Sequence, residues 1–392
     1  MATRARLSNW RRLLRIVGVI ACLVLIALAG DLLVRLRSIE YTLAVQAQIT
    51  PDGRTVSASD TLPADPAGNG KAVCPPLSIA IAGGLTGPDS EIATNVQDGV
   101  QLAVDRHNAA NAGCQVQIKQ FDTGGDPQRA SDFAPQIVGD AYTVGLIGPA
   151  LSGVAQATGA LFDANGLPSV TASASSMPLS GQGWTTFFRA VASDDAQGRA
   201  IASFLRDSLQ YKRLCVVGDN GAYATAMSHA AAVTLGKLVL PGCSSVNEIK
   251  ADAPDVVVRV GSKADSAPFV RQVRSAGITT PVVLAQGIAD ERFVTQLGRL
   301  ANGLLLACPC EPDPDWFSRA YRNRFGKAPG AYSAEGYDLA TIMLRGVDAG
   351  RLVRRQMLDW MRHYDGQGIA RRYQWTAAGE LTDPTIWIYK VQ

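Results

Sequence analysis

The chain has 392 residues, of which 47% are hydrophobic and 18% charged, and its net charge is +3. That balance excludes a disordered or low-complexity protein, and the small net charge gives no electrostatic case for binding nucleic acid. The three histidines, His107, His229 and His363, lie far apart and lack the spacing of metal ligands, so a zinc enzyme is not expected.

The N-terminus carries the pattern of a segment that directs export. Five arginines between Arg4 and Arg15 precede an apolar run from Ile16 to Val34, which Asp31 interrupts. A basic end stays in the cytoplasm, so the rest of the chain is expected on the periplasmic or extracytoplasmic side of the inner membrane. The run is near the length that spans a bilayer, so residues 16–34 are expected to be a transmembrane anchor behind a cytoplasmic tail, residues 1–15.

Two other interpretations of this run stay open. Ala27–Ala29 has the A-x-A pattern of a signal-peptide cleavage site, and Val19–Cys22 matches a bacterial lipoprotein box. The anchor is favoured because Leu32–Ile49 is predicted to continue as a helix that leaves the membrane. Residues 35–74 are then a juxtamembrane segment and a linker, since Pro51–Ala72 has no periodic apolar pattern and is rich in small and turn-forming residues.

From Leu77 onward, short apolar runs alternate with stretches of helical length. Continuous apolar strands between helices are typical of parallel sheets with both faces covered. The roughly 320 residues from Leu77 onward are also more than a single hydrophobic core usually contains. The sequence therefore predicts an α/β fold with two doubly wound parallel-sheet lobes. The predicted strands are Leu77–Ala82, Gln115–Phe121, Val144–Ile147, Pro168–Thr171, Phe187–Val191, Leu214–Gly218, Val256–Val260, Pro281–Ala285 and Gly303–Ala307.

The predicted helices fill the spaces between these strands, and a hairpin is expected to close the chain. The hairpin would join Tyr373–Trp375 to Ile386–Val391, which flank a polar turn. The helices are Glu91–Asn108, Gln128–Gly139, Gly153–Ala164, Asp195–Leu209, Thr225–Leu238, Ala264–Ala276 and Asp290–Leu300.

Six cysteines follow the apolar run, and an even number in an exported chain favours disulfides. The alternative is that some of them are buried free thiols. The pairs suggested by position are Cys74 with Cys114, which would tie neighbouring strands, Cys215 with Cys243, which stand in the same relation one lobe later, and Cys308 with Cys310, as a tight local bridge or a redox pair.

Ligands of open α/β sheets bind at the carboxyl ends of the strands. Three loops at such ends are small and polar: 83–88, 149–153 and 172–176. Their hydroxyls and backbone N–H groups near helix N-termini suit a carboxylate or another anion. Serine is also a preferred helix cap, so capping is the alternative role of each serine in these loops.

A series of short motifs extends along the chain. They are the strand and glycine turn Ile79–Pro88, the helical segment Asp98–Ala103, Asp122 with Asp126-Pro127, Phe188-Arg189 before Asp194–Gly198, the loop Gly218–Tyr223, and Gly336–Asp338. In order and spacing they resemble the periplasmic leucine/isoleucine/valine-binding family, the type I substrate-binding proteins of ABC transporters. The resemblance extends from Leu77 to about Val391.

That resemblance implies two lobes joined by three hinge strands, which close on a ligand held in the cleft between them. Residues 75–193 and 312–372 would form the first lobe, and residues 194–311 and 373–392 the second. No cofactor is implied. The implied partners are a small-molecule ligand, a membrane permease or another membrane complex, and the bilayer through the N-terminal helix.

The resemblance also implies the ligand-binding residues. Ser152 stands where the family has a ligand-binding serine, and Ser173 and Ser175 stand where it uses a backbone carbonyl and a hydroxyl. In amino-acid binders these groups hold the α-carboxylate and part of the ammonium. Tyr223 matches an aromatic residue of the second lobe that closes over the ligand, with loop packing as the alternative. Asp194, at the hinge, either reaches the ligand or caps the following helix.

Gln286 departs from the family pattern, because amino-acid binders carry an acidic residue there that neutralises the ligand ammonium. A buried ammonium without an opposite charge is costly. Either Asp194 or Glu335 supplies the charge, or the ligand is an amide, a simple carboxylate or an aromatic acid. A lobe-2 aromatic of the family is here Ser262, which suggests a more polar or roomier pocket.

Catalysis is not expected, because the sequence lacks a G-x-S-x-G elbow, a P-loop and an H-E-x-x-H motif. Three functions remain. The chain is a tethered solute receptor for an ABC permease, a ligand sensor read by a separate signalling partner, or a degenerate binding fold that serves as an accessory subunit of a membrane complex.

Overall fold

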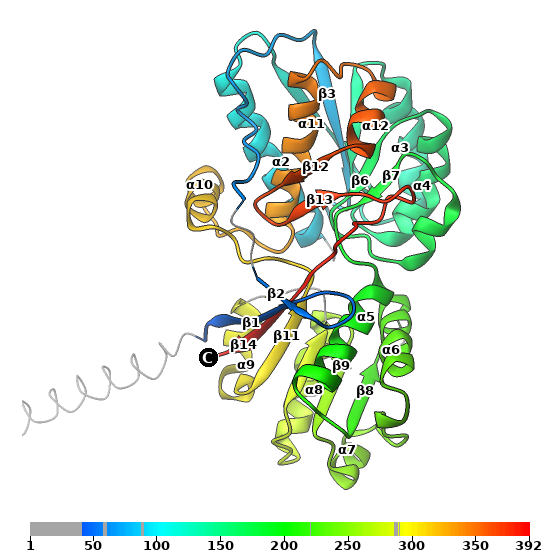
Figure 1. Ribbon diagram of the computed structural model, residues 1–392, viewed down its shortest axis with the longest axis vertical. Coiled ribbons are helices and arrows are strands. Elements are labelled where there is room, and N and C mark those ends of the chain that lie inside the picture. The colour runs from blue at the N-terminus through cyan, green and yellow to red at the C-terminus, as the bar shows by residue number, and fades with distance from the viewer. Residues whose placement is uncertain (1–40, 58–60, 88–89, 220, 286–288, 290) are drawn as a thin grey trace, which may run out of the picture.

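The computed structural model describes residues 41–57, 61–87, 90–219, 221–285, 289 and 291–392. These residues form two lobes, one above the other in Figure 1, and each lobe is built on its own main sheet. The predicted cytoplasmic tail and anchor lie outside the described residues, as does Gln286. Within the described part of the chain, no helix is both long and apolar enough to cross a membrane.

The first lobe, upper in Figure 1, has a five-stranded parallel sheet. In spatial order its strands are β4 (Val116–Asp122), β3 (Leu77–Gly83), β5 (Thr143–Ile147), β6 (Ser169–Thr171) and β7 (Phe187–Arg189). Its helices are α2 (Ser90–Ala110), α3 (Pro127–Gly139), α4 (Ser152–Ala164), α10 (Asp315–Phe325), α11 (Ser333–Asp348) and α12 (Arg354–Arg362).

Both faces of this sheet are covered, and this explains the continuous apolar strands. Every residue of β3 is buried. Ile79 and Ile81 pack in a core that includes α2 and α11, whereas Ala80 and Ala82 face a second core that includes α3 and α4. A strand buried on both sides needs apolar residues at every position, which is the pattern of a parallel sheet between helices.

The second lobe has a seven-stranded sheet, in which β14 runs antiparallel to β11 and β1 antiparallel to β14. In spatial order the strands are β2 (Thr55–Val56), β1 (Leu43–Ile49), β14 (Ile386–Val391), β11 (Leu304–Cys308), β10 (Val282–Ala285), β9 (Val256–Val260) and β8 (Leu214–Gly218). The helices are α5 (Asp194–Ser203), α6 (Ala222–Leu235), α7 (Val246–Asp252), α8 (Lys263–Ser275) and α9 (Glu291–Leu297).

The predicted fold of two lobes with parallel sheets is confirmed. Each predicted strand and helix between Leu77 and Ala307 has its counterpart in the structure, whereas α7, α10 and α12 were not predicted. Segments 190–193, 309–314 and 375–385 connect the lobes, and the first two leave the carboxyl ends of β7 and β11. The exact boundaries between the lobes stay a prediction.

The predicted C-terminal hairpin is wrong. Strand β13 (Arg372–Gln374) pairs with β12 (Asp365–Gln367), and β14 pairs with β1 and β11 in the other lobe. Tyr373 and Trp375 pack in the core of the first lobe, so the chain crosses between lobes in the segment that was predicted to be a polar turn.

The predicted helix Leu32–Ile49 is wrong for its described part, because Leu43–Ile49 is the strand β1. Its partner β14 offers a free edge, and pairing there buries Ile49 completely. The segment predicted as a linker, Pro51–Ala72, begins with β2 and then lies against the first lobe. Ala64 N donates to Gln367 O at 2.8 Å, and Ala72 N donates to Asn111 Oδ1 at 2.9 Å.

The six cysteines after the apolar run form three disulfides in the structure. One joins the segment before β3 to the start of β4, one links β8 to the segment after α6, and one closes a local loop where the chain leaves β11. The pairs are Cys74–Cys114, Cys215–Cys243 and Cys308–Cys310, as the sequence analysis suggested.

Candidate ligand-binding site

The carboxyl ends of β3, β5 and β6 meet at the edge of the first lobe that faces the second. A small cavity of about 10 Å³ lies among them, lined in part by Gly83, Ala150 and Ser173. It has room for about one water molecule. The three polar loops predicted from the sequence therefore do converge at one place in the fold.

The predicted serines of these loops form hydrogen bonds with backbone groups of neighbouring segments. Ser152 begins α4, and its hydroxyl oxygen accepts a hydrogen bond from Ser176 N at 3.2 Å. Ser173 Oγ donates to Ala150 O at 2.7 Å. The Ser175 carbonyl accepts from Asp194 N at 2.9 Å. The structure thus brings the three residues together and also gives each an internal partner.

Arg189, at the end of β7, holds the loop that carries Ser175. Its side chain is completely buried, and it donates to Ser175 O at 2.7 Å and to Ser176 O at 3.0 Å. Glu380 forms an ion pair with it at 3.1 Å. Burial lowers the pKa of the guanidinium, although Glu380 and Asp194 act in the opposite direction. The sequence motif Phe188-Arg189 marked this residue, but its role was not predicted.

Asp194 is the first residue of α5, where the chain enters the second lobe. Ser193 caps the helix by accepting from Ala196 N, so Asp194 is not needed as the cap. Its side chain is only 3% exposed, and among the described residues its Oδ1 has no hydrogen-bond partner. Burial raises the pKa of this carboxyl, while the Ser175 hydroxyl and Arg189 oppose that rise. A buried carboxylate oxygen without a donor is costly unless something else supplies the donor.

Tyr223, in the first turn of α6, reaches the same region from the second lobe. Its hydroxyl lies 3.4 Å from Gln197 Oε1, and Asp194 and Tyr332 are close enough to affect its electrostatics. Burial raises the pKa of Tyr223 well above its ordinary value. Tyr223 therefore lies near Asp194 and Tyr332, and its contact with a ligand stays a prediction.

Tyr332 resembles the family at the start of its late helix, but the sequence did not predict a role for it in the site. It precedes α11, is buried, and adopts a left-handed φ of 69°, which is uncommon for a residue other than glycine. Asp194 and Glu335 both influence its pKa, which burial raises. Strained backbone at such a place is frequent in functional sites. The signal in the sequence was its place just ahead of the Gly336–Asp338 motif.

Glu335 was one of two acids considered for a ligand ammonium. Its carboxylate forms a buried ion pair with Arg371 at 2.6 Å, and both side chains are almost fully buried. Arg371 also donates to Pro309 O in the crossover that follows β11. Because Glu335 already has a counter-charge, Asp194 is the better acceptor for a ligand cation.

Two other residues of the second lobe, Gln286 and Ser262, were considered for the site. Gln286 lies outside the described residues, so its place in the site stays a prediction. Ser262 is the N-cap of α8 and exchanges hydrogen bonds with Asp265. Within the described residues, no group of three or more His, Cys, Asp or Glu side chains is arranged to hold a metal ion.

Two α/β lobes joined by three segments, with polar loops and a buried acid near these connections, have the architecture of a two-lobed binding protein. The sequence signature of the periplasmic binding protein family matches residues 76–241 and 243–392. The chain belongs to this family, which is a family of solute-binding proteins and not of enzymes.

Individual relatives agree with this assignment. A Leu/Ile/Val-binding protein homolog of Brucella melitensis is 28% identical over 246 residues, which are 58% of this chain and 66% of that protein. The substrate-binding protein LivJ of Streptococcus pneumoniae, solved with isoleucine, covers 81% of this chain and 99% of its own, with TM-score 0.71 and 21% identity. A solute-binding protein of R. palustris, solved with benzoate, covers 81% and 94%, with TM-score 0.67 and 16% identity.

Proposed function

We propose that this protein is an extracytoplasmic receptor that closes its two lobes on a small polar solute and delivers it to an ABC permease. Membership of the binding-protein family supports the general role. The relatives that bind branched-chain amino acids support an amino acid as the ligand class. The observation that carries the proposal is the buried Oδ1 of Asp194 at the hinge, which has no hydrogen-bond partner in the part of the chain that the structure describes.

In this proposal Asp194 accepts the ligand ammonium, in place of the acidic residue that the family has at the position of Gln286. The loops of Ser152 and Ser173–Ser175 provide hydroxyls and backbone groups for the carboxylate. Tyr223 and Tyr332 cover the ligand from the second lobe and from α11. A charge-assisted hydrogen bond in a site closed to water is about twice as strong as a neutral one.

A thermal-shift comparison of two matched compounds tests the ligand class. Leucine and 4-methylpentanoate differ in the α-ammonium group alone. A ligand at 100 times its Kd adds about 2.7 kcal/mol to the stability of the folded state. We expect a rise in melting temperature with leucine or another neutral amino acid and no rise with the acid that lacks the ammonium. The full chain is used, because β1 is part of the second sheet and a chain that began at residue 75 would lack it.

The reverse result would overturn the role of Asp194. The benzoate complex of a protein with the same fold makes a ligand without an ammonium the natural alternative. Binding of 4-methylpentanoate, benzoate or an amide, without binding of any amino acid, would assign the site to that class and leave Gln286 as a neutral contact.

A second candidate function is an accessory subunit whose binding site is degenerate. The observation that favours it is the internal engagement of the predicted ligand groups, since Ser152 and Ser173 already bond to neighbouring backbone. This function predicts no thermal shift with any member of a panel of amino acids, amides and carboxylates. It also predicts stable co-purification with a membrane complex other than a permease.

Residues 16–34 are proposed to anchor the receptor to the outer face of the inner membrane. The apolar run behind five arginines supports an anchor, and a cleaved signal peptide is the alternative. A tethered receptor serves a nearby permease or, in the signalling alternative, a separate membrane partner that reads its closure.

A further inference from the structure

The family match begins at residue 76, yet the described residues ahead of it contact both lobes. We call residues 41–57 and 61–74 the N-terminal strap. In Figure 1 it starts as β1 in the lower lobe and later runs up the side of the upper lobe near α10 and α2. Its first half is built into the second lobe, and its second half is held on the first lobe by polar contacts and a disulfide.

The first half of the strap is built into the second lobe. Along β1, Leu43 to Ile49 pair with Val391 to Ile386 of β14, and Thr42 and Gln392 exchange backbone hydrogen bonds at 3.2 and 3.0 Å. Ile49 is fully buried in a core with α5 and β14. The turn after β1 also packs tightly, because a Cβ on Gly53 would meet Ser203 of α5 at 2.5 Å.

The second half of the strap lies on the first lobe and is held by polar contacts. Arg106 of α2 donates to both carboxylate oxygens of Asp65, at 2.8 and 2.6 Å. Asn111, which is buried, donates to Ala67 O at 3.0 Å and accepts from Ala72 N at 2.9 Å. The disulfide Cys74–Cys114 fixes the end of the strap beside β4.

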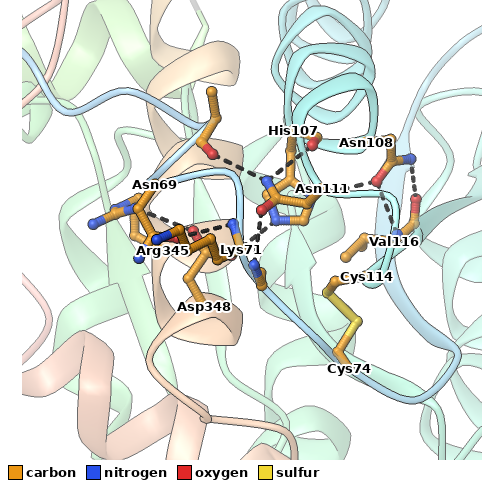
Figure 2. Close-up of polar contacts among 12 residues, drawn as sticks. Asn69, Lys71, Cys74, His107, Asn108, Asn111, Cys114, Val116, Arg345 and Asp348 are labelled. Atoms are coloured by element: carbon orange, nitrogen blue, oxygen red, sulfur yellow. Dashed lines mark hydrogen bonds and ion pairs between the residues drawn. A yellow bond between two sulfur atoms is a disulfide. The ribbon is translucent and has the colours of Figure 1, made fainter.

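Figure 2 shows this part of the strap against α2 and α11, with Asn69 and Lys71 next to Arg345 and Asp348. Gly68 has a left-handed φ of 59°, and a Cβ there would collide with the side chains of Arg345 and Asp348. Asp348 itself is fixed by His107 Nε2 at 2.9 Å. The strap therefore fits a shaped surface of the lobe and is not a loose connection.

Between the two halves the chain is short. Ser57 and Ala64 are seven residues apart in the sequence, so the span between them cannot exceed about 25 Å even when fully extended. The lobes are already joined by segments 190–193, 309–314 and 375–385. The strap is a fourth connection, and unlike these three it is not part of the region that matches the family.

We propose that the N-terminal strap limits how far the two lobes open. Any opening that moves Ser57 away from Ala64 beyond the reach of the connecting residues requires the polar contacts of the strap with the first lobe to break, beginning with Ala64 and Asp65 and continuing to Ala67 and Ala72. If they break, the free length grows to the 17 residues from Ser57 to Cys74, about 60 Å, and the limit is lost. The intact strap thus reduces the population of open states, which lowers the cost of closing on a ligand.

The experiment measures inter-lobe distance without any ligand, so its failure is separate from a failure of the proposed function. Spin labels are placed at Gln128 of α3 and Thr295 of α9, both exposed, in the full chain with Cys22→Ser. Residues 58–63 are replaced by a thrombin recognition sequence of the same length. Pulsed electron paramagnetic resonance gives the distance distribution before and after cleavage. We expect a shift to longer mean distance and a broader distribution after the cut.

Two further variants keep the test decisive. A thrombin sequence inserted at the exposed Gly350, in the turn between α11 and α12, gives a cut that lies within one lobe and should change nothing. Asp65→Ala leaves the chain intact and removes the ion pair with Arg106, so it should shift the distances in the same direction by a smaller amount. If the strap-cut protein does not fold, the Asp65→Ala result decides. Distances that stay unchanged in the cut protein overturn the proposal.

Discussion

Asp194 and Glu335 are two buried acids near the segments that connect the lobes, and they differ in what surrounds them. Glu335 is neutralised by Arg371, whereas Asp194 keeps a buried oxygen to which no described residue donates a hydrogen bond. Arg189 is close to Asp194, but its guanidinium is already committed to Ser175, Ser176 and Glu380. The difference between the two acids therefore depends on which groups each nearby arginine binds in the folded chain. The spacing of residues in the sequence does not determine those partners.

The Asp194→Asn variant is expected to bind an amino acid more weakly by about 2 kcal/mol or more, which is about 30-fold in Kd. Calorimetric titration with the amino acid that gives the largest thermal shift measures this loss. The same variant should be more stable than the native protein in the absence of ligand at pH 7. Burial raises the pKa of Asp194, so its ionisation above the ordinary carboxyl range costs stability that Asn does not lose. Equal affinity in both proteins would exclude Asp194 from the site.

Part of the site could be predicted because it is local. Ser152, Ser173 and Ser175 lie in loops directly after strands, and the direction of parallel strands brings such loops together. The roles of Arg189 and Arg371 could not be predicted, because Arg189 pairs with Glu380 and Arg371 pairs with Glu335 across long stretches of sequence. The internal bonds of the serines also depend on loop geometry that residue types alone do not determine.

At the scale of elements, β1 shows why hydropathy misled the prediction of a helix over Leu32–Ile49. The sequence LAVQAQI has too few apolar residues to distinguish a strand from a continuing helix, and its structure depends on the edge of β14 that it covers. The parallel strands were predictable because burial on both faces leaves a continuous apolar run, as in β3.

Ile49→Ala tests whether β1 is an integral strand of the second lobe. Ile49 is completely buried, so its truncation is expected to lower the free energy of unfolding by about 2–5 kcal/mol. Urea denaturation measures the change. Val45→Ala on the same strand is the matched control, because Val45 is 45% exposed and should change stability by much less. Equal effects of the two substitutions would mean that β1 is not packed as described.

The crossover after β11 and the helix α11 carry acids that make stability depend on pH. Burial raises the pKa of Glu311 to about 8, with Arg371 opposing the rise, and burial raises the pKa values of Asp313 and Asp338 to about 7. A carboxyl whose pKa is raised in the folded state contributes its full stability below its unfolded pKa, near 4. That contribution is lost as the pH rises through about 7 to 8.

The midpoint of urea denaturation is therefore expected to be lower at pH 8.5 than at pH 6. Glu311→Gln cannot ionise and should have a flatter dependence between these two values. Asp132→Asn, at an exposed position of α3, should keep the dependence of the native protein. A midpoint that rises with pH over this range would contradict the assigned direction of these pKa shifts.

At the scale of the whole molecule, the anchor and the cleaved signal peptide predict different mature proteins. Cleavage after Ala29 would leave a chain that begins at Gly30, whereas an anchor leaves residues 16–34 in place. We expect the intact mass of the protein purified from membranes to include these residues, and the protein to stay with the membrane after an alkaline wash. A mass that begins at Gly30, with the protein in the soluble fraction, would establish the signal peptide instead.

The direction of β1 has a consequence for delivery. β1 runs parallel to β11, whose carboxyl end leads into the hinge, so Leu43 lies at the end of the second lobe that is remote from the cleft. Under the proposed anchor, residues 35–42 are all that separate the bilayer from this end, a reach of about 30 Å at most. A connecting segment of this length keeps the receptor in a thin layer next to the membrane that contains its partner. Encounters then depend on a high local concentration in two dimensions, so a modest affinity for the partner suffices.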